Sequence, residues 1–314
     1  MIPDSQSSRI GTPFDEAILL VNSRSRRGKE EFEEARLHLI GQGVRIRSAL
    51  HTRHVSKLIK EAEAAIAQRQ PLIIVGGGDG TMNAVAGLFV GSKSTMGVLP
   101  MGTGNAFARD LGIATKIASA CEIAIAGAPT NVDIGRAGDG YFVNVATVGL
   151  TTKIAENLTD PMKRRFGRLV YAIALVRAYR EIRPFHTILK TENGTQEFES
   201  IQIVIGNGRF HAGPFPVLPD ASILEGKLSL YAIESRTKSE LLKFALFMSG
   251  GRHVQLNEVH SEHCLGGTLT TRPQIPVTVD GQIAQTTPLV FSTVPRGLRV
   301  MAAPGFFPAT TQPK

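Results

Sequence analysis

The chain has 314 residues, of which 42% are hydrophobic and 20% charged, and its mean hydropathy is +0.02. This composition is typical of a well-packed soluble protein and excludes disorder over the whole chain, while the length suits two domains. No apolar run reaches about 18 residues, so no transmembrane helix is expected. Residues 1–14 are polar, unlike a signal peptide, and we expect them to be a disordered lead-in.

The charge of the chain favours anionic partners. The formal net charge is +8, from 35 Lys and Arg against 27 Asp and Glu, which suits a nucleotide or an anionic membrane. Only 6% of the residues are aromatic, and basic and aromatic residues do not alternate, so no nucleic acid partner is expected. The two cysteines, Cys121 and Cys264, are far apart, which argues against a disulfide framework or a zinc site and favours the cytoplasm.

Strands and helices alternate through the first 130 residues. Short apolar runs predict strands, and apolar residues at helical spacing predict helices between them. The expected strands are residues 17–22, 44–50, 72–75 and 95–99, and the expected helices are residues 30–41, 55–67, 81–89 and 114–126. This order predicts an α/β domain over residues 15–130, built on a doubly wound, mostly parallel sheet.

The pattern changes near residue 130, where strands separated by Gly and Pro become dominant. We expect strands at residues 141–146, 187–190, 198–205, 227–233, 276–279 and 283–285, with helices at residues 167–180 and 239–248. Many short strands of this kind predict an antiparallel β-sandwich domain, over residues 131–289.

The sharpest signal in the sequence is a glycine-rich loop between a buried strand and a helix. It consists of Gly76, Gly77, Gly78, Asp79, Gly80 and Thr81. Glycines let phosphate oxygens approach the backbone N–H groups, and a helix N-terminus adds partial positive charge. The loop lacks the Gly-Lys-Ser/Thr of a Walker A motif and the third glycine of a dinucleotide fingerprint. It therefore predicts a phosphate cradle of another kind.

Asp79 stands in the middle of this loop. A carboxylate beside bound phosphates is unfavourable unless it holds a cation or accepts a proton, so Asp79 is a candidate Mg²⁺ ligand or general base. The alternative is that Asp79 or Thr81 only caps the following helix.

Two further loops follow neighbouring strands. The second contains Gly102, Thr103, Gly104 and Asn105, and we expect Asn105 to contact ribose, phosphate or adenine. The third contains Asn22, Ser25 and Arg26, which offer an amide, a hydroxyl and a guanidinium to phosphates. The alternatives are an ordinary strand-to-helix turn and a solvated basic loop, respectively.

Other polar residues give weaker signals. Asp280, Gly281 and Gln282 by themselves predict an Asp-Gly hairpin. The histidines, among them His211, His253 and the pair His260 and His263, show no convincing metal-ligand spacing and are expected to be surface or core residues.

Taken together, the motifs resemble the diacylglycerol kinase catalytic-domain family, which is related to sphingosine and ceramide kinases and, more distantly, to NAD kinases. The resemblance extends from about Ala17 to Ala303 and includes the signature Gly77-Gly-Asp-Gly-Thr81. It implies that the first domain binds ATP with Mg²⁺ near Asp79, that the β-rich domain holds the lipid, and that a strand within about residues 290–305 returns to the first domain.

The chain departs from the family at three positions. The family places a Glu, proposed as catalytic base, after Asp280-Gly281, whereas this chain has Gln282, whose amide cannot accept a proton at neutral pH. Ala106 follows Asn105 where the family often has Asp, and Glu225 is part of a reduced acidic loop, which weakens a metal site there. Either Asp79 serves as the base, with Asp280 and Gln282 as further candidate catalytic positions, or the enzyme is slow or catalytically silent.

The resemblance implies an ATP-dependent lipid kinase that acts on a diacylglycerol or on a sphingoid or ceramide-like lipid. The alternatives are a kinase of a soluble alcohol, such as NAD, and a nucleotide- or lipid-binding regulator without turnover. The expected location is the cytoplasm, with peripheral contact at the inner membrane face, and self-association as a homodimer is an open alternative.

Overall fold

The computed structural model describes residues 13–25, 27–150, 183–211, 215–234, 240, 243, 244, 247 and 251–306. The expected helix at residues 167–180 lies outside the described residues, as do Arg26 and most of residues 1–14 and 239–248. The chain forms two compact units. One contains the described residues up to Val132 and those from Leu298, and the other runs from Asp133 to Gly297.

Helices and strands alternate in the first unit, as the apolar pattern predicts. The elements in chain order are β1 (Glu16–Asn22), α1 (Gly28–Gly41), β2 (Arg45–Thr52), α2 (Val55–Ala67), β3 (Leu72–Gly77), α3 (Asp79–Ala86), the 3₁₀ turn η1 (Gly87–Phe89), β4 (Thr95–Pro100), α4 (Ala106–Asp110), α5 (Ile117–Ala126) and β5 (Ala128–Ala137). β3 and β4 are buried along their whole lengths, which explains why they read as continuous apolar runs.

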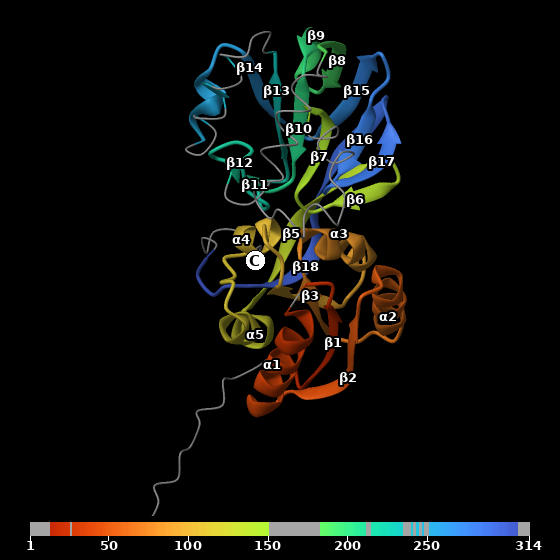
Figure 1. The fold of residues 1–314 in the computed structure, drawn as a ribbon, viewed down its shortest axis with the longest axis vertical. Coiled ribbons are helices and arrows are strands. Elements are labelled where there is room, and N and C mark those ends of the chain that lie inside the picture. Colours follow the sequence, from red (N-terminus) through yellow and green to blue (C-terminus); the bar gives the residue numbers. More distant parts are fainter. Residues whose placement is uncertain are drawn as a thin grey trace, which may run out of the picture. The chain divides into compact units, whose positions relative to one another are not determined.

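The sheet of this unit has the order β2-β1-β3-β4, and all of these pairs are parallel. The end of β18 (Leu289–Ala302) lies parallel to β4, with Val300 opposite Met96. The chain passes from β1 outward to β2 and then back across β1 to β3, so right-handed connections place α1 and α2 on opposite faces. α1 packs with α5 and α2 with α3, which confirms the doubly wound α/β fold (Figure 1).

The second unit consists mainly of strands. They are β6 (Gly140–Phe142), β7 (Val145–Gly149), β8 (Phe185–Thr191), β9 (Gly194–Ser200), β10 (Gln202–Gly206), β11 (Phe210–His211), β12 (Phe215–Pro216), β13 (Leu228–Ile233), β14 (Val259–Cys264), β15 (Gly266–Arg272), β16 (Pro276–Val279) and β17 (Gln282–Thr286), with the 3₁₀ turn η2 (Arg252–Gln255). One sheet is antiparallel and has the order β14-β13-β10-β7-β16-β17. In the other sheet, β15 pairs antiparallel with β18, β8 pairs antiparallel with β15, and β9 pairs antiparallel with β8.

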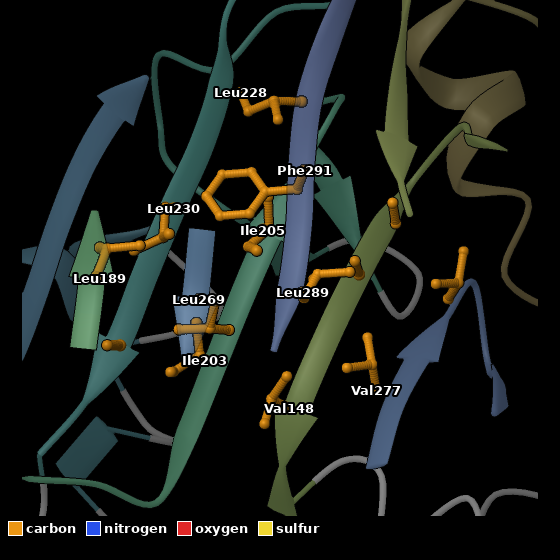
Figure 2. Packing of buried hydrophobic residues seen from close by; sticks show 14 of the residues in the cluster. Val148, Leu189, Ile203, Ile205, Leu228, Leu230, Leu269, Val277, Leu289 and Phe291 are labelled. Carbon is orange, nitrogen blue, oxygen red and sulfur yellow. The ribbon is translucent and has the colours of Figure 1, made fainter. Parts of the chain in front are cut away.

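A hydrophobic core lies between these two sheets (Figure 2). One sheet contributes Ile203, Ile205 and Leu230, and the other contributes Leu269 and Phe291. Sheets that bury facing side chains in this way form a sandwich, so the predicted antiparallel β-sandwich is confirmed.

Several boundaries differ from the sequence prediction. The single strand expected at residues 198–205 is two strands, β9 and β10, which meet at Ile201, and residues 141–146 are divided between β6 and β7. β5, β14 and β15 were not expected. β14 and β15 consist mostly of polar residues and glycine, so their sequences carry no apolar pattern that would predict a strand.

Two further expectations concern helices and cysteines. Among the described residues, no helix is both long and apolar enough to cross a membrane. Cys121 and Cys264 are buried and free, as expected for cysteines without a partner.

Candidate functional site

Three parallel strands of the first unit end side by side. In the register of the sheet, Val21 lies opposite Gly76, and Gly76 lies opposite Leu99. The loops after β1, β3 and β4 therefore leave the sheet at the same edge. The carboxyl edge of an open α/β sheet is the usual place for a ligand, and all three sequence-predicted loops lie there.

Close packing between two of these loops, and within the first turn after β3, explains several of the glycines. A Cβ on Gly102 would lie 2.5 Å from the Cα of Gly78, and a Cβ on Gly77 would lie 2.6 Å from the Thr81 Oγ1. The Met101 N–H donates to the Gly77 carbonyl at 2.9 Å. The loops after β3 and β4 thus form one packed surface that larger side chains would push apart.

Gly80 is different because the fold does not require it. A Cβ at Gly80 would meet nothing within 4 Å, and its φ lies outside the left-handed range. Gly80 is exposed in the first turn of α3, where glycine weakens the helix relative to alanine. Packing therefore does not explain this glycine, and the expected contact of Gly80 with a bound phosphate stays a prediction.

The Asp79 side chain is half-buried and points toward the start of α4. Its Oδ1 accepts a bond from the Phe107 N–H at 3.4 Å. Burial raises the pKa of the Asp79 carboxyl, and the backbone N–H groups of Phe107, Ala106 and Asn105 act against that rise. The N-cap of α3 is Gly78, which has no side chain, and the Asp79 side chain bonds to the start of α4, so Asp79 connects the two glycine loops.

Asn105 closes the second loop with its side chain. The Gly102 N–H donates to the Asn105 Oδ1 at 2.9 Å, and the Asn105 Nδ2 donates to the Gly102 carbonyl at 2.8 Å. Asn105 is also buried, with a φ of 51°. The geometry therefore gives Asn105 a role in shaping the loop, whereas the expected contact with ribose, phosphate or adenine stays a prediction. Thr103 and Gly104 lie in the closed loop, and Gly104 accepts a 3.4 Å bond from Arg109.

Asn22 joins the first loop to the start of α3. Its Nδ2 donates to the Thr81 Oγ1 at 2.8 Å, and its Oδ1 accepts a bond from the Arg24 N–H at 3.2 Å. The Ser25 Oγ lies 3.4 Å from the Glu31 Oε2. Asn22 thus lies at the same sheet edge as Thr81 and Asp79, although it is 59 positions from Thr81 in sequence.

Asp280 lies in the second unit and holds a backbone turn. Its carboxylate accepts bonds from the N–H groups of Val143 at 2.9 Å and Val145 at 2.7 Å, with Asn144 between them at 3.2 Å. Asp280 and Gly281 both have positive φ, as expected for a two-residue hairpin turn. These contacts fit a structural role, and a catalytic role for Asp280 stays a prediction.

Gln282 and Glu225 are both exposed residues of the second unit. Gln282 begins β17, opposite Val279. Next to Glu225, the Gly226 N–H donates to the Asp133 carboxylate at 2.6 Å. Within the described part of the chain, no group of three or more His, Cys, Asp or Glu side chains could hold a metal ion.

Sequence reasoning did not single out Asp133, which is 1% exposed. Its second oxygen accepts a bond from the Arg296 N–H at 2.8 Å, and burial raises the pKa of its carboxyl while both backbone bonds act against the rise. An aspartate between Val132 and Ile134 in a buried strand is the signal that could have found it.

Comparisons with known proteins identify the family of the chain. Residues 16–137 match the model of the diacylglycerol kinase catalytic domain. Residues 144–302, just over half of the chain, match the YegS C-terminal NAD kinase beta sandwich-like domain. The chain belongs to the diacylglycerol kinase catalytic-domain family, in the branch with this C-terminal domain.

Family members with known sequences and structures resemble the chain over most of its length. A diacylglycerol kinase of Staphylococcus aureus (strain bovine RF122 / ET3-1) is 27% identical over 281 residues, which are 88% of this chain and 89% of the relative. The crystal structure of a Bacillus anthracis diacylglycerol kinase has a TM-score of 0.79 at 21% identity and covers 95% of this chain and 100% of its own. Another structure from that organism gives 0.81 at 20% identity, covering 98% and 99%. Membership in this family supports kinase activity.

Proposed function

We propose that the chain transfers the γ-phosphate of ATP to a hydroxyl group of a lipid. The observation that carries the proposal is the edge formed by β1, β3 and β4, where two glycine loops touch at Gly78 and Gly102 and Gly80 faces open space. Phosphoryl transfer needs little covalent chemistry from the protein and depends on positioning and charge stabilisation. Backbone N–H groups and a helix N-terminus supply both for a triphosphate.

Asp79 is the residue we assign to the reaction. A base must lie near the phosphates and bind a proton readily, and burial raises the pKa of this carboxyl. Gln282 cannot take that role, because a neutral amide does not accept a proton.

Mg²⁺ is compatible with the donors at this edge. The ion prefers oxygen ligands and is commonly held by one or two carboxylates together with substrate phosphates. Asp79 is the residue here that would hold it as the alternative to acting as the base, and a bound Mg²⁺ would neutralise charge on the transferred group. Glu225 as a further metal ligand stays a separate, weaker proposal.

The acceptor is proposed from the relatives and from charge. Relatives that match nearly the whole chain are named diacylglycerol kinases, so a diacylglycerol or a similar lipid alcohol is the first candidate. A net charge of +8 favours peripheral contact with an anionic membrane, at the inner face if the protein is cytoplasmic.

A transfer assay tests the acceptor. Labelled ATP is incubated with the purified protein and either fractionated lipid extract or soluble alcohols that include NAD. The proposal predicts label in a lipid fraction. If label appears only in a soluble product, the acceptor is a soluble alcohol and not a lipid.

A second function is favoured by Gln282 alone. If the family's glutamate is essential, the chain would be a nucleotide- or lipid-binding regulator with weak or no turnover. Saturable ATP binding without label transfer to any acceptor would support that alternative.

A further inference from the structure

Three histidines of the second unit hold the same short segment. We call this segment the histidine strap and define it as residues 209–211 and 215–221. His211 lies within it, and His253 and His263 bind it from η2 and β14. The proposed phosphoryl transfer uses none of these three residues.

His253 is fully buried and must be neutral to fit its surroundings. Its Nε2 donates to the Val217 carbonyl at 3.0 Å, which leaves Nδ1 as the unprotonated nitrogen. That Nδ1 is buried and, among the residues that the structure describes, has no hydrogen-bond partner. The ring packs edge-on against Tyr231 and Phe244, at centroid distances of 5.2 and 5.3 Å. A proton on Nδ1 would therefore create a buried charge without an acceptor.

His211 and His263 bind other parts of the strap. The His211 Nε2 lies 3.3 Å from the Tyr231 hydroxyl, and the ring is 6% exposed. The His263 Nδ1 lies 3.2 Å from the Ser229 Oγ, and its Nε2 lies 3.2 Å from the Asp220 Oδ2. One end of the strap is thus held by two buried rings, and the other by the contact between His263 and Asp220.

The strap covers apolar side chains of the sheet. Val217, Leu218 and Ala221 are buried in a cluster that includes Tyr231 and Ile233 of β13. The Val217 N–H also donates to the Arg209 carbonyl at 2.7 Å. Release of the strap would expose this cluster to solvent.

The electrostatics of the two buried rings oppose protonation. Burial lowers the pKa of His211 to about 4, with a smaller effect from the charge of His253. Burial also lowers the pKa of His253, and the bond to Val217 acts in the other direction. Burial raises the pKa of the Tyr231 hydroxyl, so that group stays neutral.

The charged groups that the structure describes near these two rings do not pair with them. Arg209 and Arg252 lie over the rings of Phe210 and Phe247, and both are exposed. Within the described part of the chain, neither His211 nor His253 has a carboxylate partner, and Asp220 pairs with His263 instead.

We propose that the histidine strap is a pH-sensitive segment that opens in mild acid, when His211 and His253 bind protons. Opening exposes the apolar cluster beneath the strap to solvent. This inference goes beyond the proposed kinase activity and does not depend on it.

The expected pH range follows from proton linkage. A ring whose pKa is lowered in the closed state binds fewer protons there than in the open state. Closure is therefore fully stable above the ordinary histidine pKa of about 6.5 and weakens as the pH falls toward 4. For His211 alone, the ratio of open to closed strap should rise about tenfold between neutral pH and pH 5.5, and protonation of His253 adds to this.

Hydrogen exchange of the intact protein tests the proposal. Exchange is followed at pH 7.5 and 5.5 and corrected for the intrinsic effect of pH. The amides of the strap from residue 215 to residue 221, other than the prolines Pro216 and Pro219, should exchange at least about tenfold faster at pH 5.5 than at pH 7.5, while those of β10 stay unchanged. The double variant His211→Gln/His253→Gln keeps hydrogen-bonding groups but does not titrate, so its strap should lose this response. His51→Gln, an exposed position in the first unit, is the matched control and should respond like wild type.

Three outcomes would overturn the proposal. They are equal acceleration of strap and β10 amides, no acceleration of either, and an unchanged response in the double variant. If the double variant does not fold, NMR of the imidazole signals in wild type measures the pH at which His211 and His253 titrate. Titration of His211 and His253 below pH 6.5 supports the strap, and titration at or above 6.5 contradicts it.

Discussion

At the level of single residues, the glycines of the β3–α3 loop fall into two kinds. Gly77 is required by close contact with Thr81, whereas Gly80 faces free space. A residue that weakens a helix without a packing reason is a candidate for function. Asp79 is comparable, because burial of its carboxylate costs free energy that packing alone would avoid.

Gly80→Ala should therefore separate stability from activity. Alanine restores helix propensity, so the free energy of unfolding should stay the same or rise by up to about 1 kcal/mol. ATP binding and phosphoryl transfer should fall at least tenfold, because the new methyl group occupies the space proposed for phosphate.

Gly41→Ala is the matched control, since Gly41 lies at the end of α1 and a Cβ there would also meet nothing within 4 Å. Unfolding in denaturant and labelled-ATP transfer measure both variants. Full activity in Gly80→Ala would remove the reason for assigning phosphate to this space.

Gln282→Glu examines the position where the family has a glutamate. If the wild type is limited by the absence of a base, the variant should be faster, within the roughly 10²–10⁴-fold range of general-base effects. Steady-state kcat on the best lipid acceptor is the measurement. An active wild type with no gain in the variant would show that Gln282 does not limit the rate.

At the level of elements, the start of α4 depends on Asn105. Its φ of 51° is unfavourable for alanine but not for glycine, and its amide makes two bonds to Gly102. Asn105→Gly should lose about 1–2 kcal/mol of stability from the amide bonds, and Asn105→Ala about 1–2 kcal/mol more from strain. Unfolding in denaturant measures the free energy of unfolding of wild type and both variants. Equal stability of the two variants would contradict the role of the backbone conformation.

The sequence predicted α2, β3 and β4 well because their buried residues follow their apolar patterns. α2 has the predicted bounds, and β3 and β4 appear as short apolar runs. The sequence could not predict which side-chain contacts form between distant parts of the folded chain. Asp79 was recognised as a loop residue, but its bond to Phe107 joins residues 28 positions apart and depends on the contact between two loops, which no local pattern encodes.

At the level of the whole molecule, the β-rich unit was predicted in class but less well in detail. β10 and β13 are buried on both faces, so Ile203 and Val204 contact different cores and the strand shows no alternation. β14 and β15 are polar and partly exposed, so they resemble loops. Asp133 and Asp280 hold backbone N–H groups from distant parts of this unit, and such pairing requires the three-dimensional fold.

The central claim is that Asp79 carries phosphoryl transfer at the edge of the parallel sheet, and Asp79→Asn tests it most directly. Asparagine keeps an acceptor for the Phe107 N–H and removes the charge. Because burial raises the pKa of Asp79, the ionised side chain costs stability above that raised pKa and costs nothing below its ordinary value. The variant should therefore be at least as stable as wild type at pH 7.

The measurement is the transfer of label from ATP to lipid by wild type and Asp79→Asn under identical conditions. We expect transfer by wild type and a rate lower by about 10²–10⁴-fold in the folded variant. Wild-type turnover in Asp79→Asn would contradict it.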